Sequence, residues 1–160
     1  MTVFLRRACA LLLLLSLLAL TGCGGGKQDT RTMLADFLEE YGAKGGTVYA
    51  SGREAHSPEH MTDRTAALLF ADAGGENPLA LCTEYAIYLS PDFSGGEIGF
   101  FRCRSGADAA RVRHTLSARL ARLVRLLGMS DARLLCYGND TVLLALPDTA
   151  RAEQIIERIF

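Results

Sequence analysis

An apolar run near the N-terminus, interrupted only by Ser16, limits what the rest of the chain can form. The run extends over the 13 residues from Ala8 to Leu20 and follows the positive charges of Arg6 and Arg7. A helix that crosses the hydrocarbon core of a bilayer needs about 20 apolar residues, so this run is short for a permanent anchor. Its length and basic flank are typical of a secretory signal peptide, which the mature protein loses.

A short motif directly after the run marks where the signal ends. Leu20, Thr21, Gly22 and Cys23 are followed by three glycines and resemble a bacterial lipobox. The resemblance implies that Cys23 receives a diacylglyceryl group and becomes the first residue after cleavage, with the three residues before it as the cleavage flank. Two acyl chains, at about 0.8 kcal/mol per buried CH₂, make release from a membrane negligible. A plain signal peptide with a chance cysteine, or an uncleaved short anchor, are the alternatives.

The cleavage site sets the domain organisation. Removing the first 22 of the 160 residues leaves 138 and changes the formal net charge from -1 to -3. A chain of that length forms one domain with a core of its own. We therefore expect a lipoprotein signal peptide over 1–22, a flexible tether over 23–29 and a single domain over 30–160.

Apolar periodicity and turn residues predict the elements of this domain. In the first half we expect a helix from Thr30 ended by Gly42, a strand over 47–50, a helix over 58–71 capped by Ser57, and a loop over 72–78. In the second half we expect strands over 83–90 and 97–104 with a turn between them, a helix over 107–127, strands over 132–137 and 141–146, and a helix over 149–160. Two hairpins in a mostly antiparallel sheet, with helices packed on one face, make an α+β fold.

The order hairpin, long helix, hairpin, terminal helix carries a second resemblance. The segments 84–90, 97–102, 107–110 and 141–148 are similar to those of an uncharacterised family of bacterial lipoproteins, the domain of unknown function 4358 family. The resemblance covers roughly residues 45–160 and implies a signal-bearing lipoprotein with one α+β domain. It implies no activity and no catalytic residue.

Three of the five cysteines remain after cleavage and lipidation, namely Cys82, Cys103 and Cys136. All three lie in or beside apolar strand-like runs, where a thiol usually behaves as a small hydrophobic group. A disulfide is permitted outside the cytoplasm, but an odd number leaves at least one thiol over. Buried thiols, a cross-strand disulfide between Cys82 and Cys103, and metal or redox chemistry are the open alternatives.

A pair of histidines is the part of the sequence that most resembles a metal-binding motif. His56 and His60 are four residues apart, with Asp63 beyond them, but Pro58 indicates that His56 precedes the helix. The spacing also differs from that of zinc proteases, so we interpret the segment as helix capping and predict no metal or cofactor.

The long helix carries the most informative charge pattern. Its apolar stripe contains Val112, Leu116 and Leu123, and we expect four arginines near the opposite side: Arg111, Arg119, Arg122 and Arg125. One interpretation is a solvated face. The other is contact with anionic lipid headgroups or envelope polymers, to which each basic residue adds about 1 kcal/mol.

These features predict a function class and not a reaction. The chain has no nucleophile elbow, phosphate-binding loop or dinucleotide fingerprint. We expect a non-enzymatic interaction module, anchored in the cell membrane through Cys23 and facing outside the cytoplasm. An envelope protein or an anionic surface is the expected partner, and nucleic acid is excluded by compartment and net negative charge. A small-ligand binding lipoprotein is the alternative, and a cryptic cell-envelope hydrolase is the third.

Overall fold

The computed structural model describes residues 27–71, 77–91 and 96–160. The predicted signal peptide, with Leu20, Thr21 and Gly22, lies outside the described residues, as do Cys23 and the next three residues of the tether. Residues 72–76 of the predicted loop and 92–95 of the predicted turn lie outside them as well.

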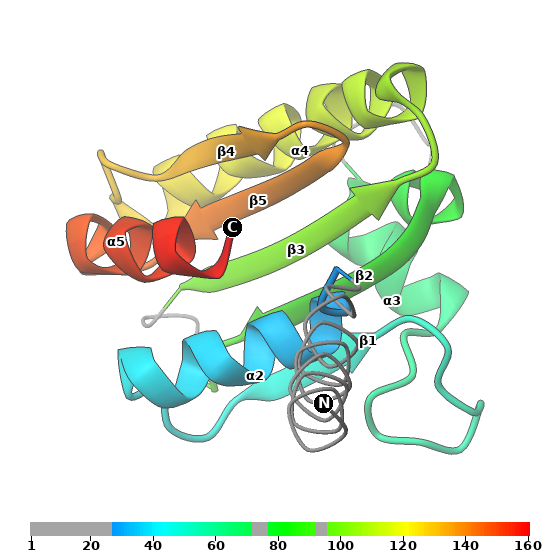
Figure 1. Cartoon of the computed structure of the whole chain (residues 1–160), viewed down its shortest axis with the longest axis horizontal. Coiled ribbons are helices and arrows are strands. Elements are labelled where there is room, and N and C mark those ends of the chain that lie inside the picture. The colour runs from blue at the N-terminus through cyan, green and yellow to red at the C-terminus, as the bar shows by residue number, and fades with distance from the viewer. Residues whose placement is uncertain (1–26, 72–76, 92–95) are drawn as a thin grey trace, which may run out of the picture.

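Five strands form one antiparallel sheet in the order β1-β2-β3-β5-β4 (Figure 1). The strands are β1 (Thr47–Ala50), β2 (Cys82–Leu89), β3 (Glu97–Cys103), β4 (Arg133–Tyr137) and β5 (Asp140–Ala145). The two predicted hairpins are β2 with β3 and β4 with β5, and the pairing of β3 with β5 joins them. The α+β class and the antiparallel sheet are therefore confirmed.

The helices agree with the expected positions at most of their ends. They are α2 (Thr30–Tyr41), α3 (Asp63–Leu69), α4 (Gly106–Leu127) and α5 (Thr149–Ile159), with a short 3₁₀ helix, η2 (Pro78–Leu81), before β2. Gly42 and Gly128 end α2 and α4 in the left-handed conformation, and Asp148 caps α5 as its side chain accepts from the Arg151 N–H. Within the described residues, no helix has both the length and the apolar character needed to cross a bilayer.

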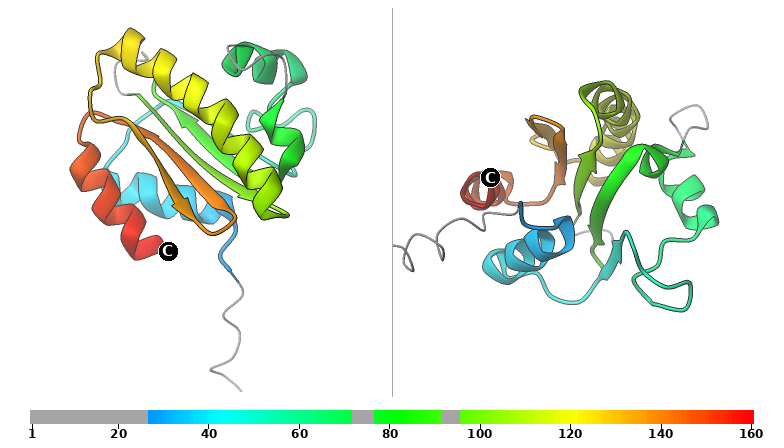
Figure 2. Two further views of the ribbon diagram at one scale, coloured as in Figure 1. Left: turned by 90° about the horizontal axis from the view of Figure 1, so that it is seen from above. Right: turned by 45° about the vertical axis from the view of Figure 1, so that its right-hand side comes forward.

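Helices cover both faces of the sheet, so the expectation of a single covered face is wrong. Figure 2 shows α2 and α5 on one side and α3 and α4 on the other. The reason lies in the central strands, which are buried on both faces. In β3, Ile98 and Phe100 face α2 and α5, whereas Phe101 and Cys103 belong to the core under α3 and α4.

The second helix begins later than predicted. The Glu59 carbonyl accepts a hydrogen bond from the Ala50 N–H at 2.9 Å, which ties this residue to the end of β1. Ser57 caps only a turn, because its hydroxyl accepts from the Glu59 N–H at 3.2 Å. Thr62 is the true N-cap of α3, so the helix over 58–71 with Ser57 as its cap is wrong.

Candidate ligand-binding site

A buried ion pair joins the start of β3 to the middle of α4. The Arg119 guanidinium donates to Glu97 Oε2 through Nη2 at 2.5 Å and through Nε at 3.2 Å. Glu97 is 2% exposed and Arg119 is 8% exposed. A carboxylate at such a depth is tolerated because a guanidinium and its hydrogen bonds accompany it.

Local sequence places both side chains. Gly96 precedes β3 with φ +85°, and a Cβ there would collide with the carbonyl oxygen of Ala145, so a glycine is required. Strand alternation then turns Glu97 to the same face as Phe101. Arg119 follows Leu116 by three residues and precedes Leu123 by four, a spacing that puts it on the face that α4 packs against the sheet.

A pocket of about 300 Å³ lies beside this pair, between the C-terminal half of α4 and the adjoining ends of β2 and β3. Its apolar wall consists of Leu89, Leu123, Leu126 and Leu127. Gly96, Glu97, Arg119 and Arg122 complete the lining. The volume falls at the lower end of the range of small-molecule sites, about 300 to 1,000 Å³.

The two carboxylate oxygens of Glu97 differ. Oε2 accepts both bonds from Arg119, whereas Oε1 is buried and accepts no hydrogen bond from any residue in the described parts of the chain. Burial raises the pKa of Glu97, and the charge of Arg119 opposes that rise. Glu97 therefore contributes to the pocket lining a carboxylate that has one buried oxygen without a hydrogen-bond partner in the described parts of the chain.

The four predicted contact arginines do not share one face. Arg111 and Arg125 are exposed, and Arg122 is half-buried at the pocket. The placement of Arg119 on the solvated side is wrong, because this side chain is buried against Glu97. Sequence reasoning missed Glu97 altogether.

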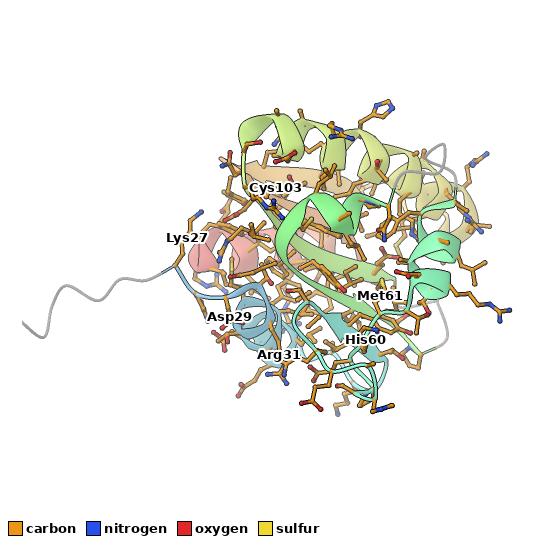
Figure 3. All side chains as sticks on the ribbon, turned by 90° about the vertical axis from the view of Figure 1, so that its right-hand side faces the viewer. Lys27, Asp29, Arg31, His60, Met61 and Cys103 are labelled. Carbon is orange, nitrogen blue, oxygen red and sulfur yellow. The ribbon has the colours of Figure 1, made fainter. Side chains whose placement is uncertain are left out.

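A second charged cluster holds the first described residues at the opposite end of β3. Arg102 donates to Glu84 Oε2 at 2.9 Å, to Asp140 Oδ1 at 3.2 Å and to the Gln28 carbonyl at 2.9 Å. Lys27 Nζ lies 2.8 Å from Asp140 Oδ2. In Figure 3, Lys27 lies at the edge of the body, towards the side on which Cys103 ends β3. We call these four charged residues the Arg102 cluster, and they place Lys27 at the end of β3 that lies away from the pocket.

The described cysteines are free thiols in three different surroundings. Cys103 is buried, Cys82 is half-buried and Cys136 is exposed. The register pairs Cys82 directly with Cys103 on the neighbouring strand.

The histidine segment forms no metal cluster in the described structure. His60 Nδ1 lies 3.2 Å from the Arg53 carbonyl, and Arg31 and Arg53 both bind Glu59. In the parts of the chain that the structure describes, no three His, Cys, Asp or Glu side chains are grouped to hold a metal ion.

Comparison with known proteins adds no relative. No family model, no curated protein and no solved structure matches this chain. The lipobox and the resemblance of the second half to a lipoprotein family stay predictions.

Proposed function

We propose that this protein is a lipid-anchored binding protein of the cell envelope. In this proposal Cys23 carries the membrane anchor, and the domain holds a small ligand in the pocket beside Glu97 and Arg119 without transforming it. The observation that carries the proposal is an apolar pocket lined by Glu97, whose buried Oε1 has no hydrogen-bond partner among the described residues. It favours a small ligand over a protein partner.

The lining supports a particular ligand chemistry. Four leucine side chains suit an apolar body, and Glu97 Oε1 suits a hydrogen-bond donor. An ammonium group would approach the charges of Arg119 and Arg122, which repel it. We therefore propose a neutral donor, a hydroxyl or an amide N–H, attached to an apolar body.

The set of lining groups suits binding more than catalysis. The one carboxylate is already bound to a guanidinium, so it is poorly placed to remove a proton from a substrate. The domain therefore acts, in this proposal, as a receptor for a ligand made or consumed elsewhere.

The strand geometry supports a direction of access. Glu97 and Arg102 lie five residues apart on β3, which is about 17 Å at 3.4 Å per residue. The Arg102 cluster holds Gln28 and Lys27, the residues nearest the predicted anchor. In this proposal the pocket therefore lies at the end of the sheet farther from the anchor, where a ligand in solution can reach it.

The anchor is tested first, by intact-mass measurement of the protein extracted from its own membranes. We expect a chain that starts at Cys23 and carries a diacylglyceryl group. A bare Cys23 thiol, or a chain that retains residues 1–22, would refute the anchor. Cys23→Ala is the control and should abolish both cleavage and lipid attachment.

The pocket is tested by thermal unfolding of the anchored protein in vesicles of neutral lipid. The probes are alkyl alcohols and alkyl amides of increasing chain length. A probe at 100 times its Kd adds about 2.7 kcal/mol, which is roughly 8 °C for a domain of this size. If no probe of either series shifts the midpoint, the proposed ligand chemistry is wrong.

Two exposed leucines give a matched pair of variants for this measurement. Leu126 is 68% exposed and lines the pocket, whereas Leu68 is 65% exposed on α3 and does not. Leu126→Glu should remove the ligand-induced shift, and Leu68→Glu should retain it. Equal shifts in the two variants would place binding elsewhere.

A further inference from the structure

The half-buried and buried cysteines lie opposite each other at one end of the β2–β3 hairpin. The register pairs Cys82 with Cys103. The Cys103 N–H donates to the Asn139 carbonyl at 3.1 Å, so its backbone polar groups point away from β2. The two cysteines therefore form a non-hydrogen-bonded pair, next to an irregularity of β2 between Cys82 and Glu84. In a regular pair of this kind the Cα atoms lie about 4.5 Å apart. Disulfides span Cα separations of about 4.4 to 6.8 Å.

The two side chains meet on the face of the sheet that α4 covers. Cys82 packs against the core that contains Cys103, and the Cys82 thiol donates to the Pro78 carbonyl at 3.5 Å. Cys103 is 4% exposed, whereas Cys82 is partly open to solvent. An oxidant can therefore reach Cys82 first, with Cys103 already beside it.

We propose that Cys82 and Cys103 form an intramolecular disulfide in the exported protein. The oxidant is a disulfide, either of a small thiol such as glutathione or of a thiol–disulfide oxidoreductase. Cys82 loses its proton and attacks the oxidant, whose S–S bond breaks to give a mixed disulfide and one thiolate. Cys103 loses its proton and attacks the Cys82 sulfur, which releases the second thiolate. The two protons convert these thiolates to thiols, so the protein pair is oxidised and the oxidant is reduced.

The third cysteine is too far away to compete within one chain. Cys136 lies on β4, and β5 separates that strand from β3. Two strand spacings amount to about 10 Å, beyond the reach of a disulfide. Cys136 therefore serves as an internal reference for a free thiol in the native chain.

The native redox state is read by differential alkylation of the full chain in its own membranes. Free thiols are blocked with N-ethylmaleimide under denaturing conditions, and the protein is then reduced and labelled with iodoacetamide. We expect N-ethylmaleimide on Cys136 and iodoacetamide on Cys82 and Cys103. N-ethylmaleimide on Cys82 and Cys103 in most molecules, or a bond from either to Cys136, overturns the proposal.

A second measurement tests the pair independently of export and of the ligand pocket. The purified chain with Cys136→Ser, which removes the exposed thiol that would itself take up glutathione, is reduced and then incubated with oxidised glutathione. We expect the mass to fall by that of two hydrogen atoms and the unfolding midpoint to rise by about 10 °C. The further substitution Cys82→Ser should abolish both changes. Failure of the Cys136→Ser chain to close refutes the proposed geometry.

Discussion

Removing Arg119, the positive partner of Glu97, is the most direct test of the buried ion pair beside the pocket. In Arg119→Met the side chain keeps an unbranched apolar stem, but Glu97 loses both of its described hydrogen bonds. Breaking a buried pair from one side costs about 3 to 5 kcal/mol. We therefore expect the free energy of unfolding at pH 7 to fall by about 4 kcal/mol. Arg125→Met, at an exposed position of α4, should change it by less than about 0.5 kcal/mol.

Urea unfolding followed by circular dichroism measures both variants, and a double variant isolates the pair. Glu97→Leu with Arg119→Met removes both charges and should restore much of the lost stability. In Arg119→Met alone, the pKa of Glu97 rises further above its unfolded value. The penalty should therefore be smallest below about pH 4 and grow as the pH rises. A loss below about 1 kcal/mol at pH 7 would refute the claim that Glu97 depends on this desolvated partner.

Three further substitutions and one control test other parts of the structure by the same unfolding measurement. Arg102→Met should lower the free energy of unfolding by about 2 kcal/mol. It should also speed proteolysis near Lys27, because it frees the first described residues. Unchanged proteolysis would contradict the role of the Arg102 cluster. Gly96→Ala should lower the free energy of unfolding by about 3 kcal/mol. Gly138→Ala is the control, because Gly138 has φ +62° but open space around it, and this variant should lose only about 1 kcal/mol. Equal losses would argue against the close approach at Gly96. Asp29→Ala should cost about 1 kcal/mol at neutral pH. Hydrogen bonds to Thr32 lower the pKa of Asp29, so its capping is lost as the pH falls below about 4, and a pH-independent difference would contradict capping by the carboxylate.

Local patterns were enough to predict most of the elements. Gly42, Gly128 and Asp148 act at helix ends within a few residues of the groups they cap, so the sequence contains the whole interaction. The start of α3 was missed because the tie between Ala50 and Glu59 competes with helix formation, and that tie depends on where β1 lies.

The sequence indicates only weakly which helices cover which face of the sheet. The segment of β3 from Ile98 to Phe101 is apolar at nearly every position, which indicates a strand covered on both sides. That pattern predicts two covered faces, but it does not say which helix lies on which face.

The ion pair of Glu97 and Arg119 beside the pocket was not predicted, because the two residues are 22 positions apart and on different elements. An arginine is usually assigned to solvent, and Glu97 stands at the edge of a turn. The signals that could have found them are the position of Arg119 within the apolar stripe and the acidic residue that opens an otherwise apolar strand.

The pairing of β3 with β5 also has a consequence for the order in which the chain folds. Each hairpin closes through contacts local in sequence, but β3 meets β5 only after the whole of α4 has been accommodated between them. Long-range pairing of this kind is slow compared with hairpin formation. We therefore expect the docking of the two hairpins to be slower than the closing of either hairpin. A chain halted before β5 would expose one edge of β3 to neighbouring molecules.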